Sequence, residues 1–172
     1  TSVKRAQGSI EAMESALHKA FPQLPFYTAY TSPTIRRILA GRGQTISDLG
    51  SALEEMAGQG VQHAIVQPTH MLCGIEYEKM QAVIDEKRSI FCRVTFGRPL
   101  LSGTEDLLRL AEILSQEYPQ QEEEALILFG HGTEHLTNAV YPALQTVFHM
   151  NARKDVLVGT VEGWPGIEEI LQ

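Results

Sequence analysis

The chain has little of several features that mark common protein classes. Its 172 residues include two cysteines, Cys73 and Cys92, which are too few for a disulfide framework and do not have the spacing of a zinc knuckle. We interpret them as buried free thiols, because reduced cysteine behaves as a small hydrophobe. No apolar run approaches the roughly 20 residues that span a bilayer, so we expect no membrane partner. The sequence has no phosphate-binding loop, dinucleotide glycine fingerprint or nucleophile elbow, which disfavours a kinase, a dehydrogenase or an esterase.

Basic residues are also few, with 14 Lys and Arg against 21 Asp and Glu and a net charge of -7. This balance argues against nucleic acid as a partner, because phosphate binding requires a basic face. A hydrophobic content of 43% with 20% charged residues is typical of a soluble globular protein. We expect a cytoplasmic homo-oligomer, with the periplasm as an alternative because the sequence does not begin with Met and a signal peptide could precede it.

Apolar and amphipathic segments alternate along the chain. The expected strands cover residues 25–30, 64–67, 90–96, 125–129 and 156–161. The expected helices cover residues 3–20, 33–40, 47–57, 77–86, 104–118, 134–149 and 165–171. Strands rich in Val, Ile, Leu and Phe without clean alternation suit a parallel sheet covered on both faces. The pattern therefore predicts a doubly wound, Rossmann-like α/β fold.

A segment with two glycines and a proline, residues 97–103, predicts a passage between two domains. We place an N-terminal α/β domain at 1–97 and the first part of a C-terminal one at 98–172, with the two units facing a cleft. Only two strands are expected after residue 98. A two-stranded parallel unit is too small to close its own core, so we expect the second unit to be incomplete.

His131 follows the apolar run 126–129 and lies between Gly130 and Gly132. The carboxyl ends of parallel strands are where α/β sheets bind ligands, so His131 is a candidate metal ligand or base. The alternative is a histidine that only bonds to backbone at a helix start. His135 follows at helical i+4 spacing, and Glu162 ends the next apolar strand. Two imidazoles and a carboxylate suit cobalt, zinc, nickel or ferrous iron.

Four other residues are weaker candidates. His70 follows the expected strand 64–67 and either faces the same cleft or is an ordinary loop histidine. Glu76 begins a helix, so it either complements the helix dipole or points a carboxylate into the cleft. Trp164 could form a wall against a flat ligand or simply pack. Arg36 belongs to a short basic helix that could hold carboxylates in bidentate pairs or could be solvated surface charge.

Three segments together resemble the anaerobic sirohydrochlorin cobaltochelatases, class II chelatases related in fold to ferrochelatase. They are Gly130-His131-Gly132-Thr133-Glu134-His135, Gly159-Thr160-Val161-Glu162-Gly163-Trp164-Pro165, and the stretch from Gln67 to Lys79. The resemblance implies a two-unit chelatase-type fold whose first strand precedes Thr1. It also implies that His131 binds metal and accepts protons, that Glu162 binds metal and that Glu76 is an acidic active-site residue.

The resemblance further implies a lyase-type enzyme that inserts Co(II), its substrate ion, into the tetrapyrrole sirohydrochlorin for cobalamin biosynthesis, without an organic cofactor. His135, His70, Arg36 and Trp164 are the expected substrate-binding residues. The family has a second catalytic histidine on a later strand, which we expect beyond Gln172. The alternative function is a metal or tetrapyrrole carrier that binds without turnover.

Overall fold

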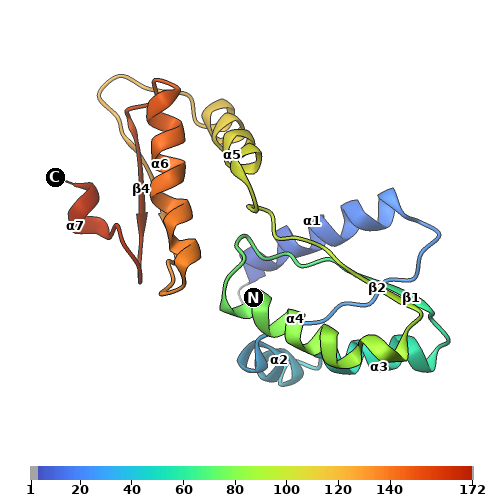
Figure 1. The fold of residues 1–172 in the computed structure, drawn as a ribbon. Coiled ribbons are helices and arrows are strands. Elements are labelled where there is room, and N and C mark those ends of the chain that lie inside the picture. The colour runs from blue at the N-terminus through green and yellow to red at the C-terminus, as the bar shows by residue number, and fades with distance from the viewer. Residues whose placement is uncertain (1–3, 172) are drawn as a thin grey trace. The chain divides into compact units, whose positions relative to one another are not determined.

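The computed structural model describes residues 4–171, with side chains from residue 8 onward, and helices alternate with short strands along them (Figure 1). In chain order the elements are α1 (Lys4–Ala20), α2 (Pro33–Ala40), α3 (Leu49–Gly58), β1 (His63–Val66), α4 (Ile75–Lys87), the 3₁₀ turn η1 (Arg88–Ile90), β2 (Arg93–Phe96), α5 (Thr104–Glu117), β3 (Leu126–Gly130), the 3₁₀ turn η2 (Leu136–Ala139), α6 (Val140–Met150), β4 (Val156–Thr160) and α7 (Ile167–Ile170). Within residues 4–171, no helix combines the length and the hydrophobicity that a membrane crossing requires.

The described residues form two compact units. The first unit holds the chain up to Val66 together with Lys79–Phe96, and the second holds Gln67–Glu78 together with the chain from Gly97 on. Helix α4 contributes to both, because its residues up to Glu78 group with the second unit. The division into domains at 1–97 and 98–172 stays a prediction.

Each unit contains one small parallel sheet. Strand β1 pairs with β2, and β3 pairs with β4, in both cases in parallel. Parallel neighbours need a crossover connection, and helices supply it in both units: α4 lies between β1 and β2 in the chain, and α6 lies between β3 and β4. The expected α/β class with parallel sheets is therefore confirmed.

In the first unit, α3 and α4 cover one face of the β1–β2 pair. Leu53 and Ile84 from the helices pack with Ala64 and Val94, which are register partners on the two strands. The side chain of Ile65, which points to the opposite face, is 67% exposed. The described part of this sheet is thus covered on one face only.

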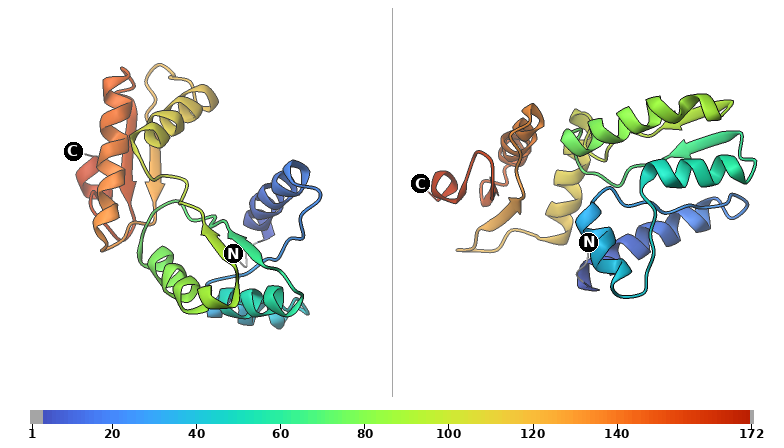
Figure 2. Two further views of the ribbon diagram at one scale, coloured as in Figure 1. Left: turned by 45° about the vertical axis from the view of Figure 1, so that its right-hand side comes forward. Right: turned by 90° about the horizontal axis from the view of Figure 1, so that it is seen from below.

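In the second unit, α5 and α6 cover one face of the β3–β4 pair, and α6 lies alongside β4 (Figure 1). Figure 2 shows the ribbon from two further sides. The core consists of Ala111, Leu144, Phe148, Val156 and Val158. Helix α7 contacts the other face, where a Cβ atom at Gly159 would lie 2.9 Å from Cδ1 of Ile170. Packing on the α6 face therefore fixes the two strands that carry the candidate site.

Three expectations are wrong. The segment 25–30 is not a strand: it makes only an isolated parallel bridge, between Ala29 and Ser47, because the described residues offer it no continuous strand to pair with. The helix expected at 134–149 begins only at η2, because side chains of the preceding loop bind the backbone N–H groups. Cys73 and Cys92 are free, as expected, but both are exposed rather than buried.

Candidate functional site

His131 follows directly on the carboxyl end of β3, and Glu162 lies two residues past the carboxyl end of β4, the paired strand. Beyond the last register pair, Gly130 and Thr160, the two chains stay hydrogen-bonded: the N–H of Val161 donates to the carbonyl of Gly130 (3.0 Å), and the N–H of Glu162 donates to the carbonyl of His131 (2.8 Å). The side chains of His131 and Glu162 also lie next to each other. Nε2 of His131 lies 3.3 Å from Oε2 of Glu162.

This pair is open to solvent, with the side chain of His131 77% exposed and that of Glu162 65% exposed. An imidazole nitrogen and a carboxylate oxygen are both ligands for borderline divalent metals, and both can accept protons. Within residues 4–171, no cluster of three or more His, Cys, Asp or Glu side chains could hold a metal ion. The pair therefore offers a two-donor, open arrangement rather than a closed structural cage.

The loop between β3 and η2 is fixed by side chains that bind its backbone N–H groups. These bonds join Gly132 N to Tyr141 Oη (3.3 Å), Thr133 N to Asn138 Oδ1 (3.1 Å), His135 N to Thr133 Oγ1 (3.1 Å) and Thr137 N to His135 Nδ1 (3.2 Å). Ser, Thr and Asn side chains compete in this way with helix formation. The loop that starts with His131 is therefore ordered without being helical.

The loop after β4 is tied to the same region. Thr160 is 1% exposed, and its hydroxyl both donates to the carbonyl of Pro165 (3.1 Å) and accepts from the N–H of Gly163 (3.1 Å). The side-chain amide of Asn138 donates to the carbonyl of Trp164 (2.6 Å). The indole of Trp164 itself is 63% exposed, which leaves it free to contact a flat ligand.

Residues 131–135 are not helical, so the helical i+4 spacing expected for His131 and His135 is wrong. Instead His135 is the N-cap of η2, with an extended backbone. Its Nε2 lies 3.3 Å from Oε1 of Glu78, and its Nδ1 lies 3.0 Å from Oγ1 of Thr137. Both ring nitrogens are thus engaged by protein groups.

The remaining candidates are spread over both units. Glu76 lies in the first turn of α4 and is exposed. His70 belongs to the second unit, and its Nδ1 is buried without a hydrogen-bond partner in the described part of the chain. Arg36 belongs to the first unit, where its Nη1 lies 3.2 Å from Oδ2 of Asp48, the N-cap of α3. The structure brings together His131 and Glu162.

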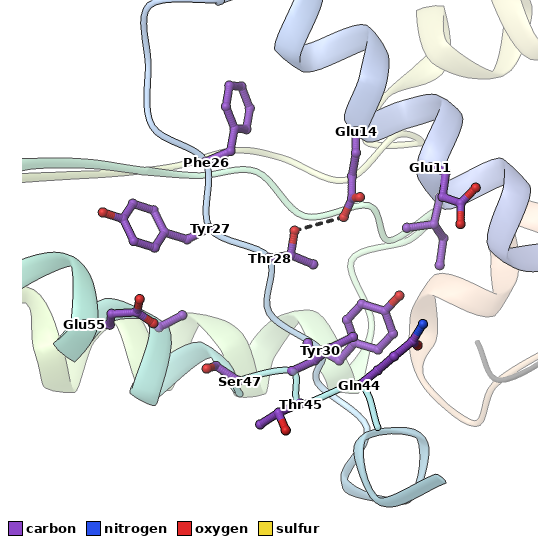
Figure 3. A pocket seen from close by; sticks show the side chains of 13 residues that line it. Glu11, Glu14, Phe26, Tyr27, Thr28, Tyr30, Gln44, Thr45, Ser47 and Glu55 are labelled. Carbon is purple, nitrogen blue, oxygen red and sulfur yellow. Dashed lines mark hydrogen bonds between the residues drawn. The ribbon is translucent and has the colours of Figure 1, made fainter. Parts of the chain in front are cut away.

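A groove of about 560 Å³ lies in the first unit beside α1 (Figure 3). None of the predicted site residues lines it. Glu14 accepts a hydrogen bond from Thr28 there (2.9 Å), and the pKa of Tyr30 is raised by burial and by the nearby charges of Glu14 and Glu11. This acidic wall disfavours an anionic ligand, and we do not assign the groove to the candidate site.

The sequence as a whole matches the family described as cobalt chelatase (CbiK) over residues 1–172. The chain belongs to the cobalt chelatase (CbiK) family. It is 34% identical over 166 residues to the sirohydrochlorin cobaltochelatase of Salmonella typhimurium, an alignment that covers 95% of this chain and 62% of that protein. It is 29% identical over 172 residues to the sirohydrochlorin cobaltochelatase CbiKC of Nitratidesulfovibrio vulgaris, covering 98% of this chain and 61% of that protein.

The chain thus spans about three fifths of the length of these two relatives, at 62% and 61%. The family expected from the three motifs is confirmed. For this cobalt chelatase family member, the roles of the individual residues stay predictions. Sequence reasoning missed Glu78 and Thr137, which contact the His135 ring, and Asn138, which accepts from the N–H of Thr133. The only sequence signal was their polarity beside the GHGTEH and GIEYEK motifs.

Proposed function

We propose that the protein is a chelatase that inserts Co(II) into sirohydrochlorin in cobalamin biosynthesis. The observation that carries the proposal is the exposed pair of His131 and Glu162, 3.3 Å apart at the ends of neighbouring parallel strands. Membership of the cobalt chelatase (CbiK) family and the names of the two relatives support the metal and the tetrapyrrole.

The chemistry of insertion matches these groups. Two pyrrole protons must leave the ring, and the ion must pass from protein donors and water to four ring nitrogens. His131 accepts a proton or holds the incoming ion through Nε2, and Glu162 supplies a carboxylate that neutralises the ion or takes a proton. A donor pair that leaves most coordination positions to water releases its ion more readily than a complete ligand set.

Other residues complete the proposed site. We assign Glu76 as a further acidic group and His70, His135 and Trp164 as contacts to the ring or its carboxylates, with the exposed indole as a wall against the flat ring. Arg36 is the proposed partner of a ring carboxylate, although its guanidinium already pairs with Asp48. No electron transfer is involved, so the reaction needs no organic cofactor.

We also propose a homo-oligomer that acts in the cytoplasm without nucleic acid or membrane partners. The free thiols Cys73 and Cys92 support a reducing compartment. The net charge of -7 argues against nucleic acid binding.

The test is a chelation assay on the whole protein with sirohydrochlorin and Co(II), Fe(II) or Ni(II). The change in the visible spectrum of the ring measures insertion. We expect insertion of Co(II), and loss of at least about a hundredfold in rate for His131→Ala. The matched control is His63→Ala, which removes an exposed histidine at the start of β1. Binding of metal and ring without insertion would instead identify a carrier.

A further inference from the structure

A second histidine–carboxylate pair lies in the unit that carries His131. Glu78 is in the first turn of α4, and His135 caps η2, 57 residues later in the chain. Their side chains meet at 3.3 Å, between Oε1 of Glu78 and Nε2 of His135. The His135 side chain is 27% exposed and that of Glu78 is 61% exposed, so this imidazole is much less open than that of His131.

The contacts of the His135 ring select one tautomer. Nδ1 faces the backbone N–H of Thr137 (3.2 Å), a group that can only donate, so Nδ1 accepts. In the neutral ring the proton then resides on Nε2, which points it at the carboxylate of Glu78. With Nδ1 used by the backbone and Nε2 by Glu78, His135 has no free nitrogen for a metal ion.

This fixed ring is part of the hydrogen-bond chain that shapes the loop after His131. The N–H of His135 donates to Thr133, whose own N–H donates to Asn138, and Asn138 also holds the carbonyl of Trp164. The same side chains thus connect the loop that starts with His131 to the loop that follows Glu162. A rotation of the His135 imidazole would remove the acceptor of the Thr137 N–H at the start of η2.

We propose that Glu78 is a positioning residue: it holds the imidazole of His135 in the Nε2–H tautomer and thereby fixes the loop that presents His131 to the ion. This role rests on the proposed function, in which His131 and Glu162 handle the metal. Groups that orient a metal-binding element without touching the ion commonly change metal affinity about tenfold to a hundredfold.

The first measurement is the tautomer of His135 in the whole protein, from nitrogen-15 NMR of labelled histidine with His135→Gln used for assignment. We expect Nε2–H alone in the parent and a mixture of tautomers in Glu78→Ala. Glu78→Gln keeps an oxygen acceptor and should retain the parent tautomer. The matched control is Glu86→Gln on the same helix, which removes an exposed carboxylate that lies 3.4 Å from the Lys87 amine.

The second measurement is the affinity for Co(II) alone by equilibrium dialysis. We expect Glu78→Ala and His135→Ala each to weaken binding about tenfold, Glu78→Gln to restore it, and the double variant to be no weaker than either single one. If Glu78→Ala destabilises the fold, Glu78→Asp, which keeps the charge but shortens the reach, should give the same loss.

Unchanged tautomer and affinity in Glu78→Ala, or losses that add in the double variant, would overturn the proposed role of Glu78. A parent protein that binds Co(II) but does not insert it would overturn the proposed function alone, because the tautomer and affinity of the variants still decide the role of Glu78. A parent that binds no Co(II) would overturn both.

Discussion

Gly132 lies so close to the backbone of Gly163 that the loop after β3 could not carry a side chain at residue 132. A Cβ atom at Gly132 would lie 2.5 Å from the backbone nitrogen of Gly163 and 2.9 Å from Cβ of Thr160. Gly132 also has a φ of 83°, in the left-handed region that favours glycine. The backbones of the two loops thus approach each other one residue beyond His131 and Glu162, which are themselves joined by a backbone hydrogen bond.

We predict that Gly132→Ala lowers the free energy of unfolding by about 3 kcal/mol, from the left-handed backbone and the overlap with Gly163 together. The control is Gly43→Ala, where φ is 80° but an added Cβ would meet nothing within 4 Å. It should cost only about 1 kcal/mol. Urea unfolding of the three proteins measures both values, and equal losses would show that the close approach contributes nothing.

A second prediction separates function from stability at His131 and Glu162. Because both side chains are more than half exposed, at 77% and 65%, His131→Ala and Glu162→Gln should each change the free energy of unfolding by less than about 1 kcal/mol. Co(II) binding should fall in both variants. Thermal unfolding and equilibrium dialysis test this together, and a large loss of stability in either variant would indicate a structural role.

The positions of His131 and Glu162 could be predicted from the sequence because each follows a continuous apolar run. Runs such as Leu126-Ile127-Leu128-Phe129 are typical of strands whose ends are marked by the first glycine or polar residue. Parallel pairing of consecutive strands around a helix then places both residues at one edge of the sheet. Only the strand order had to be assumed, and the pairing of β3 with β4 supports it.

The environment of His135 could not be predicted in the same way. Its partner Glu78 lies 57 residues earlier in the chain, and no periodic pattern links them. The local spacing suggested a helix, but Thr133 and Asn138 side chains bind backbone N–H groups of this segment, which offers its backbone an alternative to a helical conformation. The strand expected at 25–30 failed for another reason: strand propensity alone does not form a strand without a paired neighbour.

A third prediction concerns the two thiols. Because Cys73 and Cys92 are exposed, both should react with Ellman's reagent in the folded protein, without a lag for unfolding. Cys92→Ser should halve the absorbance of the thiolate that the reagent releases, and it should leave the reaction rate of Cys73 unchanged. Thiols that react only after urea is added would instead support the burial expected from the sequence.

The last prediction is a pH dependence set by Arg153 and Asp155, whose side chains are only 11% and 8% exposed. Nε and Nη2 of Arg153 donate to the two oxygens of Asp155 (2.9 and 2.8 Å), and Nη2 also donates to the carbonyl of Tyr118 (3.0 Å). The hydrogen bonds from Arg153 hold the pKa of the Asp155 carboxyl below its ordinary value of 3.8.

A carboxyl whose pKa is lower in the folded than in the unfolded state stabilises the fold above the unfolded value, and this stabilisation is lost as the pH falls through the folded value. Asp155→Asn should therefore lower the free energy of unfolding by about 2 kcal/mol at pH 7, and the difference from the parent should shrink as the pH falls below 3.8.

Glu112→Gln, which breaks the exposed pair with Arg109, is the control and should lower the free energy of unfolding by only a few tenths of a kcal/mol. Urea unfolding at pH values from 7 down to 2 measures these differences. A difference between Asp155→Asn and the parent that stays constant over that range would mean that the Asp155 carboxyl is not stabilised in its charged form by Arg153.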